Sequence, residues 1–220
     1  MLESRVESML TLLHHSGFWM VQNTVLAWIP VLLAVPLFRV WQRDVPSPRR
    51  TAAWWAGVAL FVLFLPNAPY VVTDLVHLRG DIDRLGPDGP VATTVLPVYG
   101  LLVASGFLAY YLALAQLRHY LDRVGLAARR PRIILGLHAL VAVGIFLGRW
   151  SRLNSWEPVV GPGATLHRVV DALSWTAAPV LIATLFVVTA AGHFVTRAVV
   201  EAAWATLTRA PALRRPEAAG

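Results

Sequence analysis

The sequence predicts an all-α integral membrane protein, a helical bundle with about five transmembrane helices. Two observations carry this prediction. The 220 residues are 57% hydrophobic and only 14% charged, whereas soluble domains have about 25% charged residues. The uncharged residues also gather in five gaps between charged side chains, and these gaps are 31, 23, 29, 16 and 25 residues long. Because a helix needs roughly 20 apolar residues to cross a bilayer, a soluble globular domain and a disordered chain are both excluded.

Each predicted helix occupies one of these gaps. The gaps are bounded, in chain order, by Glu7 and Arg39, Arg50 and Asp74, Asp88 and Arg118, Arg132 and Arg149, and Asp171 and Arg197. The five helices are accordingly expected near residues 18–38, 52–72, 91–116, 133–148 and 173–194.

The remaining residues form two short tails around the bundle. The amino-terminal tail, the transmembrane bundle and the carboxyl-terminal tail are expected at residues 1–17, 18–200 and 201–220. The stretch 198–210 is expected to lie on the inner membrane surface as a short amphipathic helix. The chain after Pro211 is expected to be disordered.

The orientation of the bundle is predicted from arginine. All 19 basic residues are arginine, and the chain has no lysine and no cysteine. The loops and tail on one side of the bundle hold 13 arginines, and those on the other side hold 6. Since basic residues concentrate on the cytoplasmic side, we expect the amino terminus outside and the carboxyl terminus inside. The net charge of +7 then needs no nucleic-acid partner, and the absence of cysteine excludes a thiolate site.

The fourth helix is the shortest. Its gap of 16 residues spans about 24 Å, less than the roughly 30 Å of a hydrocarbon core. Arg149 at its outer end must therefore snorkel or sit in a polar pocket. Gly144 and Gly148 follow the small-xxx-small pattern of closely packed helices, and Gly100 with Ala104 repeats it on the third helix. We expect these two helices to pack together.

Polar side chains gather in two segments that the topology places on the outer side. In the first, residues 65–78, Pro66 and Pro69 remove two backbone donors. The freed carbonyls need partners inside the protein, so we expect the prolines to bend or end the second helix within the bundle. Four polar residues follow the spacing i, i+3, i+7 and i+10, which is about 80° of arc on one helical face: Asn67, Tyr70, Asp74 and His77.

The last two of these residues, Asp74 and His77, have ionisable side chains. A carboxylate and an imidazole three residues apart can share a proton or ligate a metal. A lone Asp-x-x-His pair is a weak metal signal, and we assign no metal site. An interfacial helix with its polar side in water explains the same pattern, so the functional and the structural interpretations both stay open.

The second segment, residues 148–158, follows the short fourth helix. Its polar and aromatic residues include Arg149, Arg152, Asn154, Trp156 and Glu157. Arginine at a membrane surface can bind phosphate or carboxylate through two parallel hydrogen bonds. These arginines are candidates to bind a lipid headgroup or to pair with Asp74 across the bundle. Plain charge anchoring of the helix is the alternative.

Three further polar residues lie within the predicted apolar helices. Gln22 and Asn23 are expected to form hydrogen bonds between helices. His138 lies about a third of the way along the fourth helix. An ionisable residue inside the membrane is a functional candidate by default, but a neutral histidine bonded to a neighbouring helix explains it as well.

The two polar segments resemble the signatures of a bacterial membrane-protein family, the one catalogued as domain of unknown function 1361. Residues 65–78 carry the first signature and residues 148–157 the second, and residues 23–30 are similar to the family's first helix. The resemblance covers roughly residues 20–200. Glu157 stands where the family usually has aspartate. The resemblance implies a multi-pass protein of the bacterial inner membrane, and it implies no activity or cofactor.

Two functions fit these residues best. The first is a binding or accessory membrane protein whose outer pocket holds a lipid headgroup or a partner protein, with the binding residues Asn67, Tyr70, Arg149, Arg152, Asn154 and Trp156. The alternative is a hydrolase or transferase for a lipid-linked substrate at the outer leaflet, with the catalytic residues Asp74, His77 and Glu157. A transporter is less well supported, because five helices without an internal repeat are a poor template. The sequence identifies no cofactor.

The predicted orientation can be tested with reporter fusions. Alkaline phosphatase fused to the carboxyl terminus should be inactive, because that enzyme needs the outer compartment, and a fluorescent protein at the same place should be bright. The reverse result would contradict the orientation and, with it, the outer placement of both polar segments.

Overall fold

The fold is a bundle of long helices. The computed structural model describes residues 2–40, 51–85 and 91–209. Some residues used in the sequence predictions lie outside the described residues. They are Arg43, Arg49 and Arg50, which enter the orientation prediction, Asp88, which bounds the third gap, and the tail 211–220, which was expected to be disordered.

The helical elements follow one another with short connections. Nine are α-helices in the described ranges: α1 (Leu2–Ala34), α2 (Ala52–Phe64), α3 (Asn67–Tyr70), α4 (Leu78–Leu85), α5 (Leu96–Arg123), α6 (Arg130–Trp150), α7 (Glu157–Val160), α8 (Pro162–Leu173) and α9 (Ala178–Arg209). Two π-helices, η1 (Val35–Val40) and η3 (Val91–Val95), and two 3₁₀-helices, η2 (Val71–His77) and η4 (Ala127–Arg129), extend or join them.

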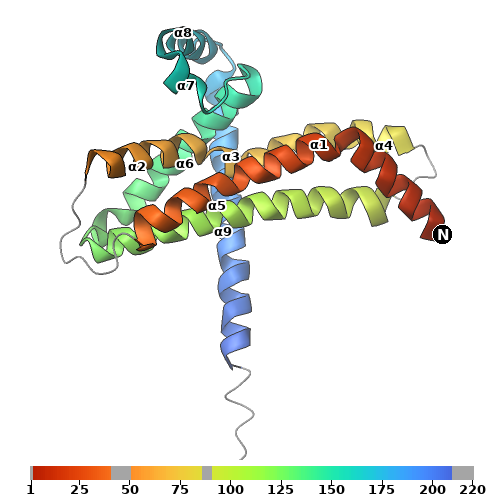
Figure 1. The fold of residues 1–220 in the computed structure, drawn as a ribbon, viewed down its shortest axis with the longest axis horizontal. Coiled ribbons are helices and arrows are strands. Elements are labelled where there is room, and N and C mark those ends of the chain that lie inside the picture. Colours follow the sequence, from red (N-terminus) through yellow and green to blue (C-terminus); the bar gives the residue numbers. More distant parts are fainter. Residues whose placement is uncertain (1, 41–50, 86–90, 210–220) are drawn as a thin grey trace, which may run out of the picture.

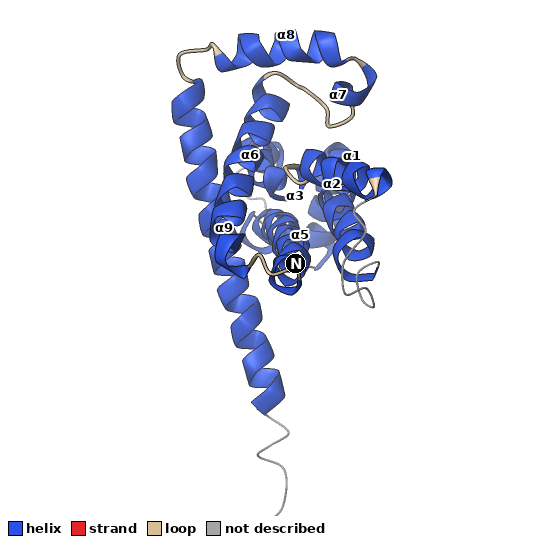
Figure 2. Cartoon of the chain, turned by 90° about the vertical axis from the view of Figure 1, so that its left-hand side faces the viewer, coloured by secondary structure: helices blue, strands red, loops and turns tan. Residues whose placement is uncertain are grey.

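Five stretches are long and apolar enough to cross a membrane, which confirms the predicted number. They are His14–Arg39, Ala52–Leu85, Thr93–Arg123, Ala127–Trp150 and Ala178–Thr208. In Figure 1, α1, the α2–α4 segment and α5 run in the same general direction, while α9 crosses them at a steep angle. Figure 2 shows α8 lying crosswise over the ends of α6 and α9, with α7 beside it.

Three features differ from the sequence expectations. The stretch 198–210 was expected as a separate surface helix, and this is wrong: α9 runs without interruption to Arg209. Neither glycine nor proline interrupts its last four turns. Arg197 and Glu201, one turn apart, form an ion pair at 2.7 Å that stabilises the helix. The amino-terminal tail is helical from Leu2 onward. The fourth loop also contains α8, which was not expected.

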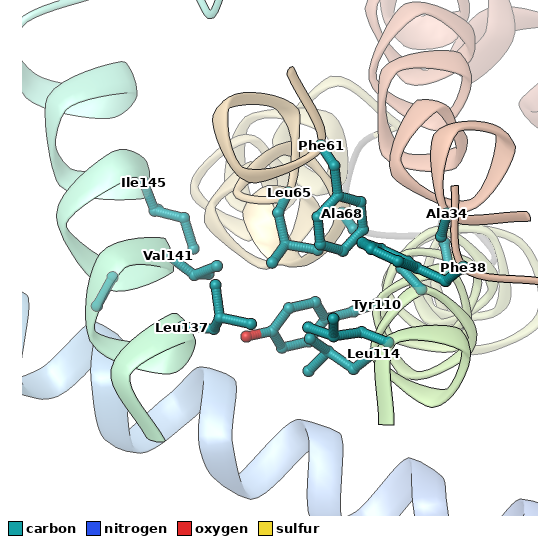
Figure 3. Close-up of a cluster of buried hydrophobic side chains, with 14 of the residues drawn as sticks. Ala34, Phe38, Phe61, Leu65, Ala68, Tyr110, Leu114, Leu137, Val141 and Ile145 are labelled. Atoms are coloured by element: carbon teal, nitrogen blue, oxygen red, sulfur yellow. The ribbon is translucent and has the colours of Figure 1, made fainter. Parts of the chain in front are cut away.

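A cluster of buried apolar side chains fills the centre of the bundle (Figure 3). Tyr110 of α5 lies in this cluster, fully buried, between side chains of α2, α3 and α6. The other labelled members come from α1, η1, the α2–α3 segment, α5 and α6: Ala34, Phe38, Phe61, Leu65, Ala68, Leu114, Leu137, Val141 and Ile145. Close packing of this kind replaces the hydrophobic effect as the main cohesive force between helices in lipid.

Glycines let two helices approach the α2–α3 segment from opposite sides. A Cβ on Gly106 of α5 would lie 2.5 Å from the carbonyl oxygen of Ala68, and a Cβ on Gly144 of α6 would lie 2.5 Å from Cγ of Pro66. Gly148 faces the ring of Tyr70, with 3.3 Å from its virtual Cβ to Cε2. The expectation that the glycines join the third and fourth helices is therefore wrong. Their contact is with the proline segment, which inserts between α5 and α6.

Polar rings are buried deep in the bundle. The hydroxyl of Tyr110 on α5 is 2.8 Å from Nδ1 of His138 on α6, which confirms a histidine bonded to a neighbouring helix. His193 of α9 lies beside it, with 5.2 Å between the two imidazole centroids. The three side chains thus join α5, α6 and α9, while Nε2 of His138 and Nδ1 of His193 have no hydrogen-bond partner among the described residues.

Substitution of the glycines on α6 tests this packing. Gly144→Ala should lower the free energy of unfolding by roughly 1–3 kcal/mol, because the new methyl group overlaps a rigid proline ring. Gly136→Ala is the matched control on the same helix. Its Cβ would meet no atom within 4 Å, so it should stabilise the helix by about 0.5–1 kcal/mol. Equal effects in thermal unfolding of the detergent-solubilised protein would contradict the close approach.

Candidate functional site

The site is built around the break in the second transmembrane segment. The α-helix α2 ends at Phe64. Pro66 and Pro69 lie in the segment that follows, where the short helix α3 leads into the 3₁₀-helix η2. The carbonyl of Leu65 accepts from the N–H of Ala68 at 3.2 Å. The carbonyl of Phe64 accepts from the side-chain amide of Asn67 at 3.0 Å. The prediction that the prolines end this helix inside the protein is confirmed, since Pro69 is buried.

The two polar segments meet at this break. The amide of Asn67 also donates to Oγ of Ser155 at 2.9 Å, across 88 residues of sequence. The ring of Tyr70 packs on Gly148 at the end of α6. These contacts close one side of a pocket of about 220 Å³.

The pocket is uncharged and amphipathic. Its polar lining consists of amide and hydroxyl side chains: Gln22, Asn23, Asn67, Tyr70, Asn154, Ser155 and Thr165. Its apolar lining includes Leu26, Leu63, Phe64, Leu147 and Val169, with Trp156 at the loop. The lining comes from α1, the α2–α3 segment, α6, the loop after it and α8.

The loop between α6 and α7 is held by Glu157. One carboxylate oxygen accepts from the backbone N–H of Asn154 at 3.1 Å and from its side-chain amide at 2.9 Å. The other oxygen pairs with Arg168 of α8 at 2.5 Å. The hydrogen bonds from Asn154, together with the guanidinium of Arg168, hold the pKa of Glu157 below its ordinary value. Glu157 thus stays ionised and ties the loop to α8.

The two arginines predicted to bind a headgroup lie outside the pocket lining. Arg152 is exposed and has φ of 51°, a left-handed conformation that non-glycine residues rarely adopt. It lies in the turn that ends α6, where the N–H of Ser151 and the N–H of Leu153 both reach the carbonyl of Leu147. Arg149 is half-buried in the last turn of α6, one residue beyond the lining residue Gly148.

Asp74 pairs with an amide on α1. Its side chain is only 2% exposed, and Oδ2 accepts from Nδ2 of Asn23 at 2.7 Å. The predicted ion pair with Arg149 is not formed among the described residues, so that expectation is wrong. Asn23 reaches the carboxylate from the adjacent helix and supplies the partner that the arginine was expected to provide. The prediction that Asn23 forms a hydrogen bond between helices is confirmed.

The predicted common face of the first segment does not form. Asn67 and Tyr70 line the pocket, whereas Asp74 is bonded to α1 behind it and His77 is exposed, with its ring 5.1 Å from that of Trp19. The 100° spacing assumed an unbroken α-helix, but residues 71–77 form a 3₁₀-helix. With about three residues per turn, the later side chains point in other directions.

A second buried carboxylate was not anticipated. Asp81 is 2% exposed and accepts from Oγ of Ser16 at 2.7 Å, from the hydroxyl of Tyr99 at 2.7 Å and from Arg84 at 2.8 Å. These donors come from α1, α4 and α5, so the cluster joins three elements. Ser16 and Tyr99 are far from Asp81 in sequence, and no local pattern marks them as its partners.

Other lining residues were missed for a similar reason. Thr165 and Val169 lie one turn apart on α8, in a loop whose helical character was not predicted. Ser155 lies inside the second signature, but the sequence alone gives its hydroxyl no partner. In the structure, this hydroxyl accepts from the amide of Asn67. The described residues contain no group of three His, Asp or Glu side chains able to hold a metal ion.

The fold and the site define the class as a multi-pass helical membrane protein with an uncharged pocket at the end of a broken helix. The chain belongs to the family described as protein of unknown function (DUF1361), whose sequence profile matches residues 22–191. The matched range contains both polar segments and every residue of the pocket lining. Neither the comparison with curated proteins nor the comparison with solved structures finds a match.

Mutant cycles test the partner of Asp74. Asn23→Ala should lower the free energy of unfolding by about 1–3 kcal/mol, since it leaves a buried carboxyl group without its donor. Combined with Asp74→Ala, the loss should be smaller than the sum, with a coupling of roughly 0.5–3 kcal/mol. The matched cycle of Asp74→Ala with Arg149→Ala should show the smaller coupling. A larger coupling for the arginine would mean that the ion pair is the dominant partner.

Proposed function

We propose that this protein binds a lipid headgroup in the pocket between the α2–α3 break and the α6–α8 loop. The observation that carries the proposal is the composition of the pocket wall. Amides and hydroxyls line one part, and apolar side chains of α1, α2, α6 and α8 line another. An amphipathic ligand with a polar head and an apolar chain fits both parts at once.

The surroundings of the pocket support a position at the membrane boundary. Three tryptophans near it are each about half exposed: Trp150 at 43%, Trp156 at 46% and Trp175 at 48%. Tryptophan is enriched where the hydrocarbon meets the headgroups. Trp150 ends α6 and Trp175 lies just before α9, so both occur at the ends of predicted spans.

The helix α8 has the character of an interfacial helix. Leu166, Val170 and Leu173 follow the spacing i, i+4 and i+7 and are 64%, 58% and 42% exposed. An exposed apolar stripe on a helix that lies crosswise to its neighbours (Figure 2) suits the plane of the interface. On the adjacent face of α8, Thr165 and Val169 line the pocket. A lipid in the neighbouring leaflet would thus have the pocket within reach.

We propose the outer leaflet as the source of the ligand, because the arginine distribution predicts that this end of the bundle faces outward. A binding or accessory role is favoured over catalysis. Asp74, His77 and Glu157 were the proposed catalytic residues, and none of the three belongs to the pocket lining. The carboxylate of Glu157 is engaged by Asn154 and Arg168, and Asp74 is engaged by Asn23.

Two tryptophan substitutions on α8 test the proposal. Val169→Trp should fill the pocket, whereas Val170→Trp adds the same bulk to the exposed face one residue away. Each variant is reconstituted in nanodiscs with a bacterial polar lipid extract, extracted into mild detergent, and examined by native mass spectrometry. The wild type and Val170→Trp should retain lipid, and Val169→Trp should lose at least about nine-tenths of it, which is a loss of binding free energy of roughly 1.4 kcal/mol.

Thermal unfolding of both variants serves as the folding control. Equal lipid retention by the two folded variants, or the absence of retained lipid in the wild type, would contradict a lipid site at this pocket.

A further inference from the structure

We infer that the pocket selects a neutral, hydroxyl-rich headgroup, such as a glycosyl or glycerol group, over a phosphate. The inference rests on the proposed function, because it names the chemistry of the headgroup that the same pocket would take. It replaces the anion site that the two arginines of the second segment suggested. Two independent features of the described residues carry it: the charge of the lining and the direction of its hydrogen bonds.

The lining has no arginine, aspartate or glutamate among the described residues. Charged donors form the strongest hydrogen bonds to phosphate, and Arg is enriched wherever phosphate is bound through two bonds. Arg149 and Arg152 lie near the pocket without lining it, and Arg168 is paired with Glu157 at 2.5 Å. A phosphate that enters this pocket would lose part of its hydration shell and would meet no cation in the lining. Such a transfer of charge out of water is unfavourable.

Each of the three asparagines of the lining donates at least one amide hydrogen within the protein. Asn23 donates to the carboxylate of Asp74 at 2.7 Å. Asn67 donates to the carbonyl of Phe64 at 3.0 Å and to Ser155 at 2.9 Å. Asn154 donates to the carboxylate of Glu157 at 2.9 Å. A backbone carbonyl and an ionised carboxylate accept hydrogen bonds and donate none, so these partners orient each amide with its nitrogen toward them.

The carbonyl oxygens of the three amides accept from no other described residue. Each can accept up to two hydrogen bonds, so a ligand that brings donors is favoured. Asn23 and Asn154 also keep one N–H each, and the side chains of Gln22, Tyr70 and Ser155 add both donors and acceptors. A phosphate diester brings acceptors alone and would leave the carbonyl oxygens unpaired. Hydroxyl groups donate and accept, so they suit both kinds of lining group.

The size and the apolar part of the pocket point to one small headgroup on a chain. Pockets for drug-sized ligands measure roughly 300–1,000 Å³, and this pocket measures about 220 Å³. Leu63, Phe64 and Val169 extend the polar part with apolar surface, which a free sugar would leave uncovered. We therefore assign the hydroxyl-rich group to a lipid rather than to a soluble sugar.

A set of probes with one common chain tests the inference. Hexyl glucoside, hexyl phosphate and hexyltrimethylammonium share the alkyl chain and differ in the head, and methyl glucoside keeps the sugar without the chain. Binding to the full-length protein in nanodiscs is measured by saturation-transfer NMR, and the signal of Val169→Trp is subtracted as the contribution of the bilayer. Hexyl glucoside should bind at least about tenfold more tightly than the other three probes.

A charge added to the lining should reverse the preference. Gln22→Arg brings a guanidinium into the pocket and should raise the affinity for hexyl phosphate at least about tenfold, while the affinity for hexyl glucoside falls. Val21→Arg is the matched control, because Val21 is exposed on the same helix and is not among the lining residues. It should leave both affinities unchanged.

The outcomes separate the inference from the proposed function. Preferred binding of hexyl phosphate or of hexyltrimethylammonium to the wild type, abolished by Val169→Trp, would overturn the headgroup assignment and leave the lipid site standing. Equal binding of methyl glucoside and hexyl glucoside would overturn the lipid source. Binding of no probe above the Val169→Trp signal would overturn both proposals.

Discussion

The structure depends on how a broken helix satisfies its backbone inside a membrane. Pro66 and Pro69 remove two hydrogen-bond donors, and hydrocarbon offers no replacement. The carbonyl of Leu65, which Pro69 leaves without its helical donor, accepts from the N–H of Ala68. The side-chain amide of Asn67 then donates to the carbonyl of Phe64 and to Ser155 in a distant loop. Glycines on α5 and α6 let both neighbours approach the irregular segment closely. The pocket exists because this break and that loop are held together.

The charged and the neutral polar groups of this region have different roles. Charged side chains are paired outside it: Glu157 with Arg168, and Asp81 with Arg84. Amides then line the pocket itself, and their nitrogens are turned toward protein acceptors. This leaves a neutral surface of amide and hydroxyl groups beside apolar side chains. Such a surface can hold a headgroup without placing a net charge next to hydrocarbon, where charge is costly.

The number and approximate position of the spans could be predicted, because the charge gaps reflect the thickness of the bilayer. The two segments of the site could be predicted as well, since Pro66, Pro69 and the polar run after Gly148 interrupt apolar sequence. The hydrogen-bond partners of the residues in these segments could not be predicted. Asn23 bonding Asp74 and Asn67 bonding Ser155 depend on distances across the bundle, and the turn to a 3₁₀-helix after Tyr70 changed the directions of Asp74 and His77.

The contact between Asn67 and Ser155 also sets an order of assembly. The α2–α3 segment leaves the ribosome well before α6 and the loop that follows it. In a chain that is still incomplete, Gly144 and Gly148 are not yet there to receive Pro66 and Tyr70, and half of the bonds of the Asn67 amide are unmade. These contacts can form only after the later residues have been made. The full set of bonds of this segment therefore depends on Ser155, which lies 88 positions downstream of Asn67.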